Sequence, residues 1–272
     1  MIIIGEKTNG SIPSVADAIA RRDADFIKNR AKMQAEANAS FIDCCASVPE
    51  DIEVETLKWM IDCIQEVTDL PISIDSPSAD VLAQVYTHCK RPGLFNSVSG
   101  EGDKIDKIFP IMAKEENKKW EVIALLSDNT GIPKTAQDRL RVFKHIMEKA
   151  KEYGISPSRI HIDPLVEMLC TSEDGIAMNV EVISTIRKEY PSIHITAAIS
   201  NISFNLPVRK LINCCFLTLA MNAGLDSAIL DPLCSAALGL KLLILAWISR
   251  KNSLSKRFDK ILTSPLSAFL PF

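Results

Sequence analysis

The sequence predicts an α/β fold, a (β/α)8 or TIM barrel built as a single domain. Short apolar runs that resemble buried strands alternate eight times with helical patterns, without a long break, and such alternation favours parallel strands covered by helices. Eight units in roughly 250 residues match the size of a closed barrel. The competing fold is an open doubly wound sheet, whose nucleotide-binding members carry a G-x-G-x-x-G turn after the first strand. Residues 5–10 do not have that pattern, so we favour the barrel.

The predicted strands are short apolar runs that stop at polar or turn-forming residues. In chain order they are residues 1–5, 41–45, 70–77, 93–99, 120–126, 159–164, 194–199 and 226–232. Residues 6–10 are polar and are predicted to form a loop after the first strand. The seventh strand ends in a polar turn that contains Ser200 and Asn201. Amides and hydroxyls at the mouth of a buried strand are typical ligand contacts of α/β proteins, although such turns also occur simply as capped turns.

The predicted helices follow the strands and repeat apolar residues at three- to four-residue spacing. They are residues 14–22, 25–38, 51–67, 79–89, 103–116, 135–153, 179–189, 209–223 and 234–248. Gly154 is well placed to end the long sixth one. We expect the barrel to span residues 1–249 and residues 250–272 to form an atypical basic tail that is poorly ordered.

Composition and charge exclude several classes of function. The net charge of −3 argues against nucleic acid as a partner, because phosphate backbones need a basic face. No stretch supplies the ~18 uncharged apolar residues of a membrane span, and no secretory signal opens the chain. Eight cysteines without a C-x-x-C pair indicate reduced thiols in a cytoplasmic protein. The four histidines lack metal-binding spacing, so we expect no protein-bound metal.

Carboxylates and amides mark the predicted carboxyl ends of the strands. They are Glu6, Asp43, Asp75, Asn96, Ser127, Asp163, Asn201 and Asp231. The carboxyl ends of barrel strands share one face, and clustered buried carboxylates repel one another unless they find donors. A ligand rich in N–H groups supplies such donors: in a pterin, the 2-amino group and N3–H form a pair that a carboxylate can accept.

No side chain in this ring is an obvious nucleophile. Cys44 and Cys45 are candidates, but no histidine lies near them in the sequence to activate a thiol, although one can lie near in space. The composition of the ring therefore favours chemistry by positioning two bound partners over covalent catalysis.

Six motifs carry a resemblance to a known family. They are IGEKTNG (residues 4–10), SIDS (73–76), FNS (95–97), TGIPK (130–134), IDPL (162–165) and SNIS (200–203). Each motif alone is weak, but the six occur in register at the predicted strand ends. The set closely resembles the methyltetrahydrofolate–corrinoid protein methyltransferases, members of the pterin-binding barrels together with dihydropteroate synthase and the folate domain of methionine synthase. The resemblance covers residues 1 to about 232.

The resemblance implies a pterin-binding barrel, usually a homodimer, that acts on tetrahydrofolate. Asp75, Asn96 and Asp163 match positions that hold the pterin ring. Asn201 matches the catalytic amide that hydrogen-bonds N5, the atom that carries the methyl group. The further folate-binding positions that we expect are Glu6, Asp43, Ser200 and Arg209.

The implied partner is a separate corrinoid protein whose cobalamin-type cobalt exchanges the methyl group with N5. We expect transfer from methyl-corrinoid to tetrahydrofolate, which gives 5-methyltetrahydrofolate in a demethylation pathway. Two alternatives stay open: a dihydropteroate synthase-like enzyme and a non-catalytic pterin- or corrinoid-binding module. Dihydropteroate synthase needs a Gly-rich pyrophosphate loop, and residues 45–49 lack its Ser-Thr-Arg-Pro-Gly type of sequence.

Two departures from the family pattern stand out. Many relatives have Asp-x-Asn on the second strand, where this chain has Asp43-Cys44-Cys45 and therefore no amide side chain. Residues 238–272 are basic and rich in Leu and Ser, unlike the acidic last helix of relatives. The second departure affects stability and dimerisation more than pterin contacts.

Overall fold

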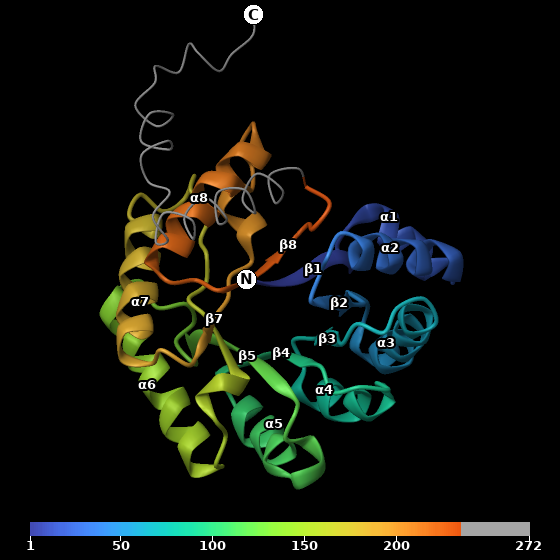
Figure 1. The fold of residues 1–272 in the computed structure, drawn as a ribbon, viewed down its shortest axis with the longest axis horizontal. Helices are drawn as coiled ribbons and strands as arrows, with labels where there is room; N and C mark the ends of the chain where they lie inside the picture. The colour runs from blue at the N-terminus through green and yellow to red at the C-terminus, as the bar shows by residue number, and fades with distance from the viewer. Residues whose placement is uncertain (235–272) are drawn as a thin grey trace, which may run out of the picture. The chain divides into compact units, whose positions relative to one another are not determined.

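A computed structural model describes residues 1–234 of the chain, and within them eight parallel strands form one sheet in the order β7-β6-β5-β4-β3-β2-β1-β8 (Figure 1). The strands are β1 (Ile2–Asn9), β2 (Phe41–Cys45), β3 (Ile72–Asp75), β4 (Leu94–Gly100), β5 (Glu121–Asp128), β6 (Ile160–Asp163), β7 (His194–Ile195) and β8 (Ser227–Leu230). Figure 1 shows them ringed by helices. The predicted (β/α)8 barrel is confirmed.

The helices between the strands are α1 (Pro13–Ala20), α2 (Ala24–Glu36), α3 (Glu50–Gln65), α4 (Ala79–Val85), α5 (Lys104–Ala113), α6 (Ala136–Glu152), α7 (Gly175–Glu189) and α8 (Arg209–Ala223). Short 3₁₀ turns are η1 (Tyr86–His88), η2 (Glu115–Asn117), η3 (Pro157–Arg159) and η4 (Ile199–Ser203). The predicted helix at 234–248, except Cys234, and the tail at 250–272 lie outside the described residues.

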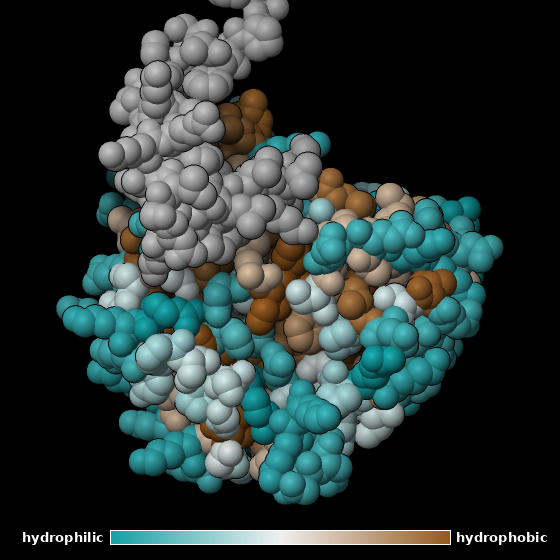
Figure 2. Space-filling model, in the orientation of Figure 1, coloured by the Kyte–Doolittle hydropathy of each residue, from teal (hydrophilic) through white to brown (hydrophobic). Residues whose placement is uncertain are grey.

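Side-chain hydrogen bonds start several of these helices. Asp23, Ser78 and Thr135 accept bonds from the backbone N–H three residues later, at the N-termini of α2, α4 and α6. Such caps satisfy donors that a helix start leaves unpaired. The helices then turn their apolar residues toward the sheet, as in α3, where Leu57, Ile61 and Ile64 are fully buried. The outward faces are mainly hydrophilic, as Figure 2 shows for the side that it draws.

The barrel closes between β7 and β8 through two backbone hydrogen bonds. Asp226 N donates to Ile195 O at 3.2 Å, and Ile229 N donates to Ala197 O at 2.9 Å. Thr196 N bonds to Ile162 O of β6, whereas the next residue, Ala197, accepts from β8. The chain therefore changes its partner from β6 to β8 at this point, and no regular ladder forms between β7 and β8. The seventh strand is therefore much shorter than the predicted 194–199, and the polar turn that follows it is η4.

Several other boundaries also differ from the prediction, and β1 and α7 are two examples. β1 does not stop at Gly5 but continues to Asn9, where it pairs with Cys45 of β2. Its polar residues are retained in the sheet because the buried Thr8 donates its hydroxyl to Asp43 O at 2.5 Å. α7 begins at Gly175, four residues before the predicted start.

Hydrophobic side chains fill the barrel interior. Ile4, Leu94 and Ile123 form a buried cluster with Phe41, so strands on both sides of the ring share one core. Among the described residues, no helix is long and apolar enough to cross a membrane.

Candidate active site

The carboxyl ends of the parallel strands place the candidate residues on one face of the barrel. Asp75 and Asp163 are the last residues of β3 and β6, while Asp43 and Asn96 lie within β2 and β4. Strand pairing sets Cys45 beside Asp75 and Asp75 beside Asn96. Three neighbouring strands therefore present a continuous row of polar side chains.

Asp43 lies two residues before Cys45, level with Ser73 of β3, and has 1% of its surface exposed. Its Oδ1 accepts hydrogen bonds from Ser73 Oγ at 2.7 Å and from Asn96 Nδ2 at 3.1 Å. Burial raises the pKa of the Asp43 carboxyl well above its usual range, and the nearby Asp75 carboxylate raises it further. Asp43 thus fixes the orientation of the Asn96 amide, whose carbonyl oxygen remains available to a ligand.

Asp75 is half-buried at the end of β3. Burial raises its pKa to about 6, opposed by a hydrogen bond with the Cys45 side chain. The Cys45 thiol also lies 3.3 Å from Ser47 Oγ. Burial, reinforced by the charge of Asp75, raises the pKa of the Cys45 thiol. The thiol therefore stays protonated near neutral pH, which argues against Cys45 as a nucleophile.

Asp163 ends β6 with 5% of its surface exposed. Burial raises its pKa to about 6, opposed by a hydrogen bond from Leu165 N and by the charge of Arg139. The Leu165 N–H donates to Asp163 Oδ1 at 2.8 Å. One carboxylate oxygen therefore holds the local turn, and the other is free for a ligand donor.

Glu6, Ser200 and Arg209 form a second connected group. Ser200 Oγ donates to Glu6 Oε2 at 3.2 Å, and Arg209 Nη2 donates to Ser200 O at 3.1 Å. Burial raises the pKa of Glu6, opposed mainly by the charge of Lys7. Because Glu6 also raises the pKa of Asp43, the two groups lie within electrostatic reach of each other. The predicted loop position of Glu6 is wrong, since Glu6 belongs to β1.

Asn201 lies in η4, next to Ser200. Its backbone is fixed: Asn201 N donates to Ala198 O at 3.2 Å, and Asn201 O accepts from Phe204 N at 3.3 Å. Arg209 supports the same turn by donating to Ser203 Oγ at 3.1 Å. The half-buried side-chain amide of Asn201 makes no hydrogen bond to any residue among 1–234. This turn thus presents an amide whose donors and acceptor are not used by any of residues 1–234.

The described residues contain no group of three or more His, Cys, Asp or Glu side chains suited to a metal ion. The ring offers carboxylate and amide oxygens together with the Asn201 amide, which has no side-chain partner in the described part of the chain. These groups suit a flat heterocycle with N–H donors on one edge. Comparison with known proteins is consistent with this chemistry, since residues 5–231 match the family described as pterin binding enzyme. The chain belongs to the pterin-binding enzymes.

Two curated relatives illustrate the range of this family. This pterin-binding enzyme is 49% identical over 232 residues to the methylcorrinoid:tetrahydrofolate methyltransferase of Eubacterium limosum, a match that covers 85% of each chain. It is 30% identical over 240 residues to the methionine synthase of Mycobacterium tuberculosis, covering 84% of this chain but only 20% of that longer protein.

Solved structures share the fold at low sequence identity. Dihydropteroate synthase from Burkholderia cenocepacia superposes with a TM-score of 0.67 at 13% identity and covers 92% of this chain and 93% of its own. The Xanthomonas albilineans enzyme in complex with 7,8-dihydropteroate gives a TM-score of 0.61 at 15% identity, with 81% and 85% covered. These likenesses establish the barrel fold of the pterin-binding enzyme.

Sequence reasoning missed two residues that support the ring. Ser73 precedes Asp75 by two positions in β3, so the two-residue period of a strand already placed it on the same face. Arg139 is fully buried on the inner face of α6, between Ala136 and Val142. A charged residue in a buried helical stripe was the signal that could have found it.

Proposed function

We propose that this pterin-binding enzyme is a methyltransferase that moves a methyl group between the cobalt of a corrinoid protein and N5 of tetrahydrofolate. The direction that we propose is from methyl-corrinoid to tetrahydrofolate, giving 5-methyltetrahydrofolate. The observation that carries the proposal is the 49% identity, over 85% of both chains, to a relative named for this activity. The ring of acids and amides supports it, because such a ring suits a pterin and contains no evident covalent catalyst.

Each site residue receives a role in the proposal. The carboxylates of Asp75 and Asp163 accept N–H donors of the pterin ring, and Asn96, oriented by Asp43, supplies an amide that can donate and accept. Glu6, Ser200 and Arg209 form the side of the site next to η4. Asn201 hydrogen-bonds N5.

In the proposed reaction the main task of the protein is to orient N5 of tetrahydrofolate relative to the methyl group. The corrinoid supplies the methyl group, and N5 is a nucleophile in its own right. As the N5 lone pair attacks the methyl carbon, the cobalt–carbon bond breaks and leaves its electron pair on cobalt, and N5 then loses its proton to water. Asn201 can accept a hydrogen bond from N5–H, which leaves that lone pair free and holds N5 in line with the methyl group. In the reverse direction N5 is a poor leaving group until positive charge builds on it, and hydrogen bonding at N5 then assists.

The proposal also includes the setting of the enzyme. The corrinoid is carried by a separate partner protein, the chain acts as a homodimer, and it works in the cytoplasm. No resident metal is needed for the proposed step, since the cobalt arrives with the partner.

A single assay tests the function. The full-length protein is mixed with a methylated corrinoid protein and tetrahydrofolate, and the cobalt absorption spectrum is followed together with the formation of 5-methyltetrahydrofolate. We expect both signals to appear only when all three components are present. Folate binding without methyl transfer would instead indicate a non-catalytic pterin-binding module. Condensation of a pterin pyrophosphate with p-aminobenzoate would establish the dihydropteroate synthase alternative.

A further inference from the structure

A single buried arginine organises the loop that follows Asp163. Arg139 comes from α6 and has no exposed surface. Its Nη1 donates to Pro164 O and, at 2.7 Å, to Leu165 O, while its Nε donates to Pro133 O at 3.1 Å. One side chain thus joins the loop before α6 to the two residues directly after Asp163.

The turn that Arg139 holds is conformationally strained. Leu165 has a φ of +65°, in the left-handed region that non-glycine residues seldom occupy. The same residue donates its N–H to Asp163 Oδ1 at 2.8 Å. The direction of the Asp163 carboxylate therefore depends on a backbone conformation that needs outside support, and the bonds from Arg139 supply that support.

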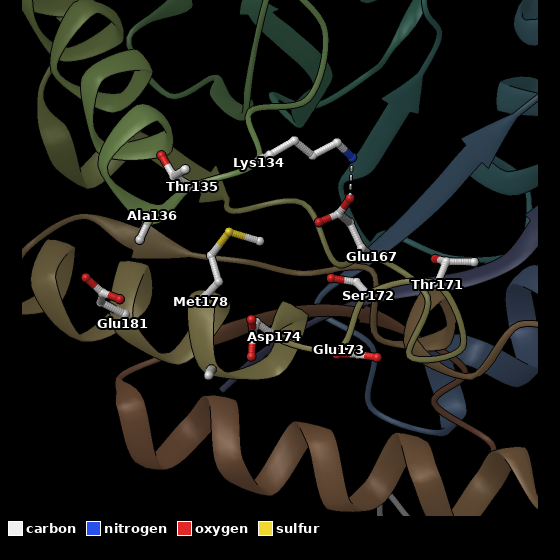
Figure 3. A pocket seen from close by; sticks show the side chains of 11 residues that line it. Lys134, Thr135, Ala136, Glu167, Thr171, Ser172, Glu173, Asp174, Met178 and Glu181 are labelled. Atoms are coloured by element: carbon white, nitrogen blue, oxygen red, sulfur yellow. Dashed lines mark hydrogen bonds and ion pairs between the residues drawn. The ribbon is translucent and has the colours of Figure 1, made fainter.

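Glu167 balances the charge of the buried guanidinium. Its Oε2 accepts from Arg139 Nη2 at 2.9 Å, and its Oε1 pairs with Lys134 Nζ at 2.8 Å. Figure 3 shows the Lys134 side chain reaching Glu167 at the edge of a surface cavity of about 600 Å³. Since Lys134 is 77% exposed and Arg139 is not exposed, Glu167 links the surface to the buried arginine.

The same loop also reaches the segment that carries Asn201. Leu169 N donates to Ile202 O at 3.0 Å, and Cys170 Sγ lies 3.6 Å from Phe204 O. The loop fixed by Arg139 therefore supports the η4 turn as well as Asp163.

We propose that Arg139 is a positioning residue for folate binding, which acts by holding the turn that aims the Asp163 carboxylate into the site. The inference rests on the proposed function, because it takes Asp163 as a contact of the pterin ring. Arg139 itself does not touch the ligand. Its planar guanidinium group donates to three backbone carbonyls and one carboxylate, and no other side chain has this arrangement of donors.

A double-mutant cycle tests this role on the full-length protein, with the dissociation constant of tetrahydrofolate measured by calorimetry. We expect Arg139→Met to raise Kd about tenfold, a size typical when the outer partner of a binding group is lost. In the Asp163→Asn background we expect Arg139→Met to cause a much smaller further rise, because the residue through which it mainly acts is already impaired and only the support of η4 is still lost. Additive losses, or an unchanged Kd in the single variant, would overturn the proposal.

Arg159 offers a matched control at the opposite end of the barrel. It also donates to three backbone carbonyls, of Trp120 at 2.8 Å, Asn117 at 2.9 Å and Met112 at 3.0 Å. We expect Arg159→Met to lower the melting temperature but to leave the folate Kd unchanged. An equal rise of Kd in Arg139→Met and Arg159→Met would mean that Arg139 is merely structural.

A conservative variant keeps the test decisive if Arg139→Met does not fold. Arg139→Lys retains the charge but not the fork of donors, so the same cycle with Arg139→Lys is expected to give a smaller, still non-additive rise in Kd. An Arg139→Lys protein with wild-type affinity would contradict the inference.

If the wild-type protein itself does not bind tetrahydrofolate, the proposed function fails and the inference fails with it. A wild type that binds normally, combined with an additive cycle, rejects the role of Arg139 alone.

Discussion

Asn96 donates its side-chain amide to the buried Asp43 carboxylate across 3.1 Å. The same oxygen accepts from Ser73, so Asp43→Ala leaves two donors of the barrel interior unpaired. We expect the free energy of unfolding to fall by about 1–3 kcal/mol for each donor that is buried without a partner. We also expect weaker tetrahydrofolate binding, since the Asn96 amide is then free to rotate. Denaturant titration and calorimetry measure the two effects.

Ser73→Ala is the control for this prediction. It removes one donor to Asp43 but leaves the bond from Asn96 in place, so folate affinity is expected to stay close to that of the wild type. The orienting role of Asp43 would be rejected if Ser73→Ala and Asp43→Ala raised the folate Kd equally.

Ionisation of the site gives folate binding a predictable pH dependence. Burial raises the pKa of Asp75 and of Asp163 to about 6, and the ionised carboxylates accept the N–H donors of a pterin more strongly than the protonated acids do. We expect folate affinity to be constant well above pH 6 and to fall as the pH drops through about 6. Isothermal titration from about pH 5 to about pH 8 measures this, because that range lies above the ordinary carboxyl pKa of about 4 and spans the raised values. An affinity that stays constant down to about pH 5 would contradict the role of the two carboxylates.

The stability of the ligand-free protein is expected to change in the opposite sense. A carboxyl whose pKa is raised in the folded state binds protons there more tightly than in the unfolded chain. Between the unfolded pKa of about 4 and the folded pKa, this contribution to stability is therefore lost as the pH rises. We expect Asp75→Asn to flatten this part of the stability curve relative to the wild type. A steeper curve in the variant would show that the sign is wrong.

Asn201 is expected to affect rate more than binding. Its side chain has no hydrogen-bond partner among residues 1–234, so Asn201→Ala disturbs no internal contact of the described fold. We expect kcat for methyl transfer to fall about a hundredfold, a loss typical when a hydrogen bond to the reacting atom is removed. The folate Kd is expected to change much less. If Asn201→Ala instead left kcat unchanged and lowered kcat/KM only by weakening folate binding, Asn201 would be an ordinary binding residue.

The sequence predicted Asp75 and Asp163 at strand ends because apolar runs stop there, and the structure places both as the last residues of their strands. It failed for Glu6, because the polar residues after Gly5 look like a loop while Thr8 is buried in the continuing strand. Arg139 was missed for a different reason. Three of its partners are backbone carbonyls, which every residue type provides and which therefore leave no trace in the sequence.

The amino-terminal rim of the barrel contains a polar network that is separate from the site. Asp226, just before β8, accepts from His194 Nδ1 at 2.9 Å and from Ile195 N at 2.8 Å. Its carboxylate also pairs with Arg187 at 2.9 Å. The His194 ring lies 4.7 Å from that of His161, centroid to centroid. These contacts bridge β7 and β8, where the barrel has only two backbone hydrogen bonds.

The polar network of His194, Asp226 and Arg187 at the seam between β7 and β8 is expected to stabilise the fold most strongly in mildly acidic solution. The hydrogen bond to Asp226 raises the pKa of His194, so this contribution is complete below the unfolded pKa of about 6.5 and is lost as the pH rises through the folded value. Burial raises the pKa of Asp226, but hydrogen bonds from His194 and Ile195 outweigh it and lower the pKa. The contribution of Asp226 to stability is therefore present above a pH of about 4 and is lost in stronger acid.

Asp226→Asn tests this expectation through its difference from the wild type in the free energy of unfolding, measured by denaturant titration at several pH values. We expect a loss of about 1 kcal/mol between pH 5 and 6, kept small because Asp226 is partly exposed to water, and a smaller loss as the pH rises towards 9 and His194 gives up its proton. Folate affinity should not change, because Asp226 precedes β8 at the rim opposite the carboxylate ring. A difference that stays constant or grows towards pH 9 would show that the charged His194–Asp226 pair does not hold the seam, and that the hydrogen bond donated by Ile195 N to the Asp226 carboxylate carries the stabilisation.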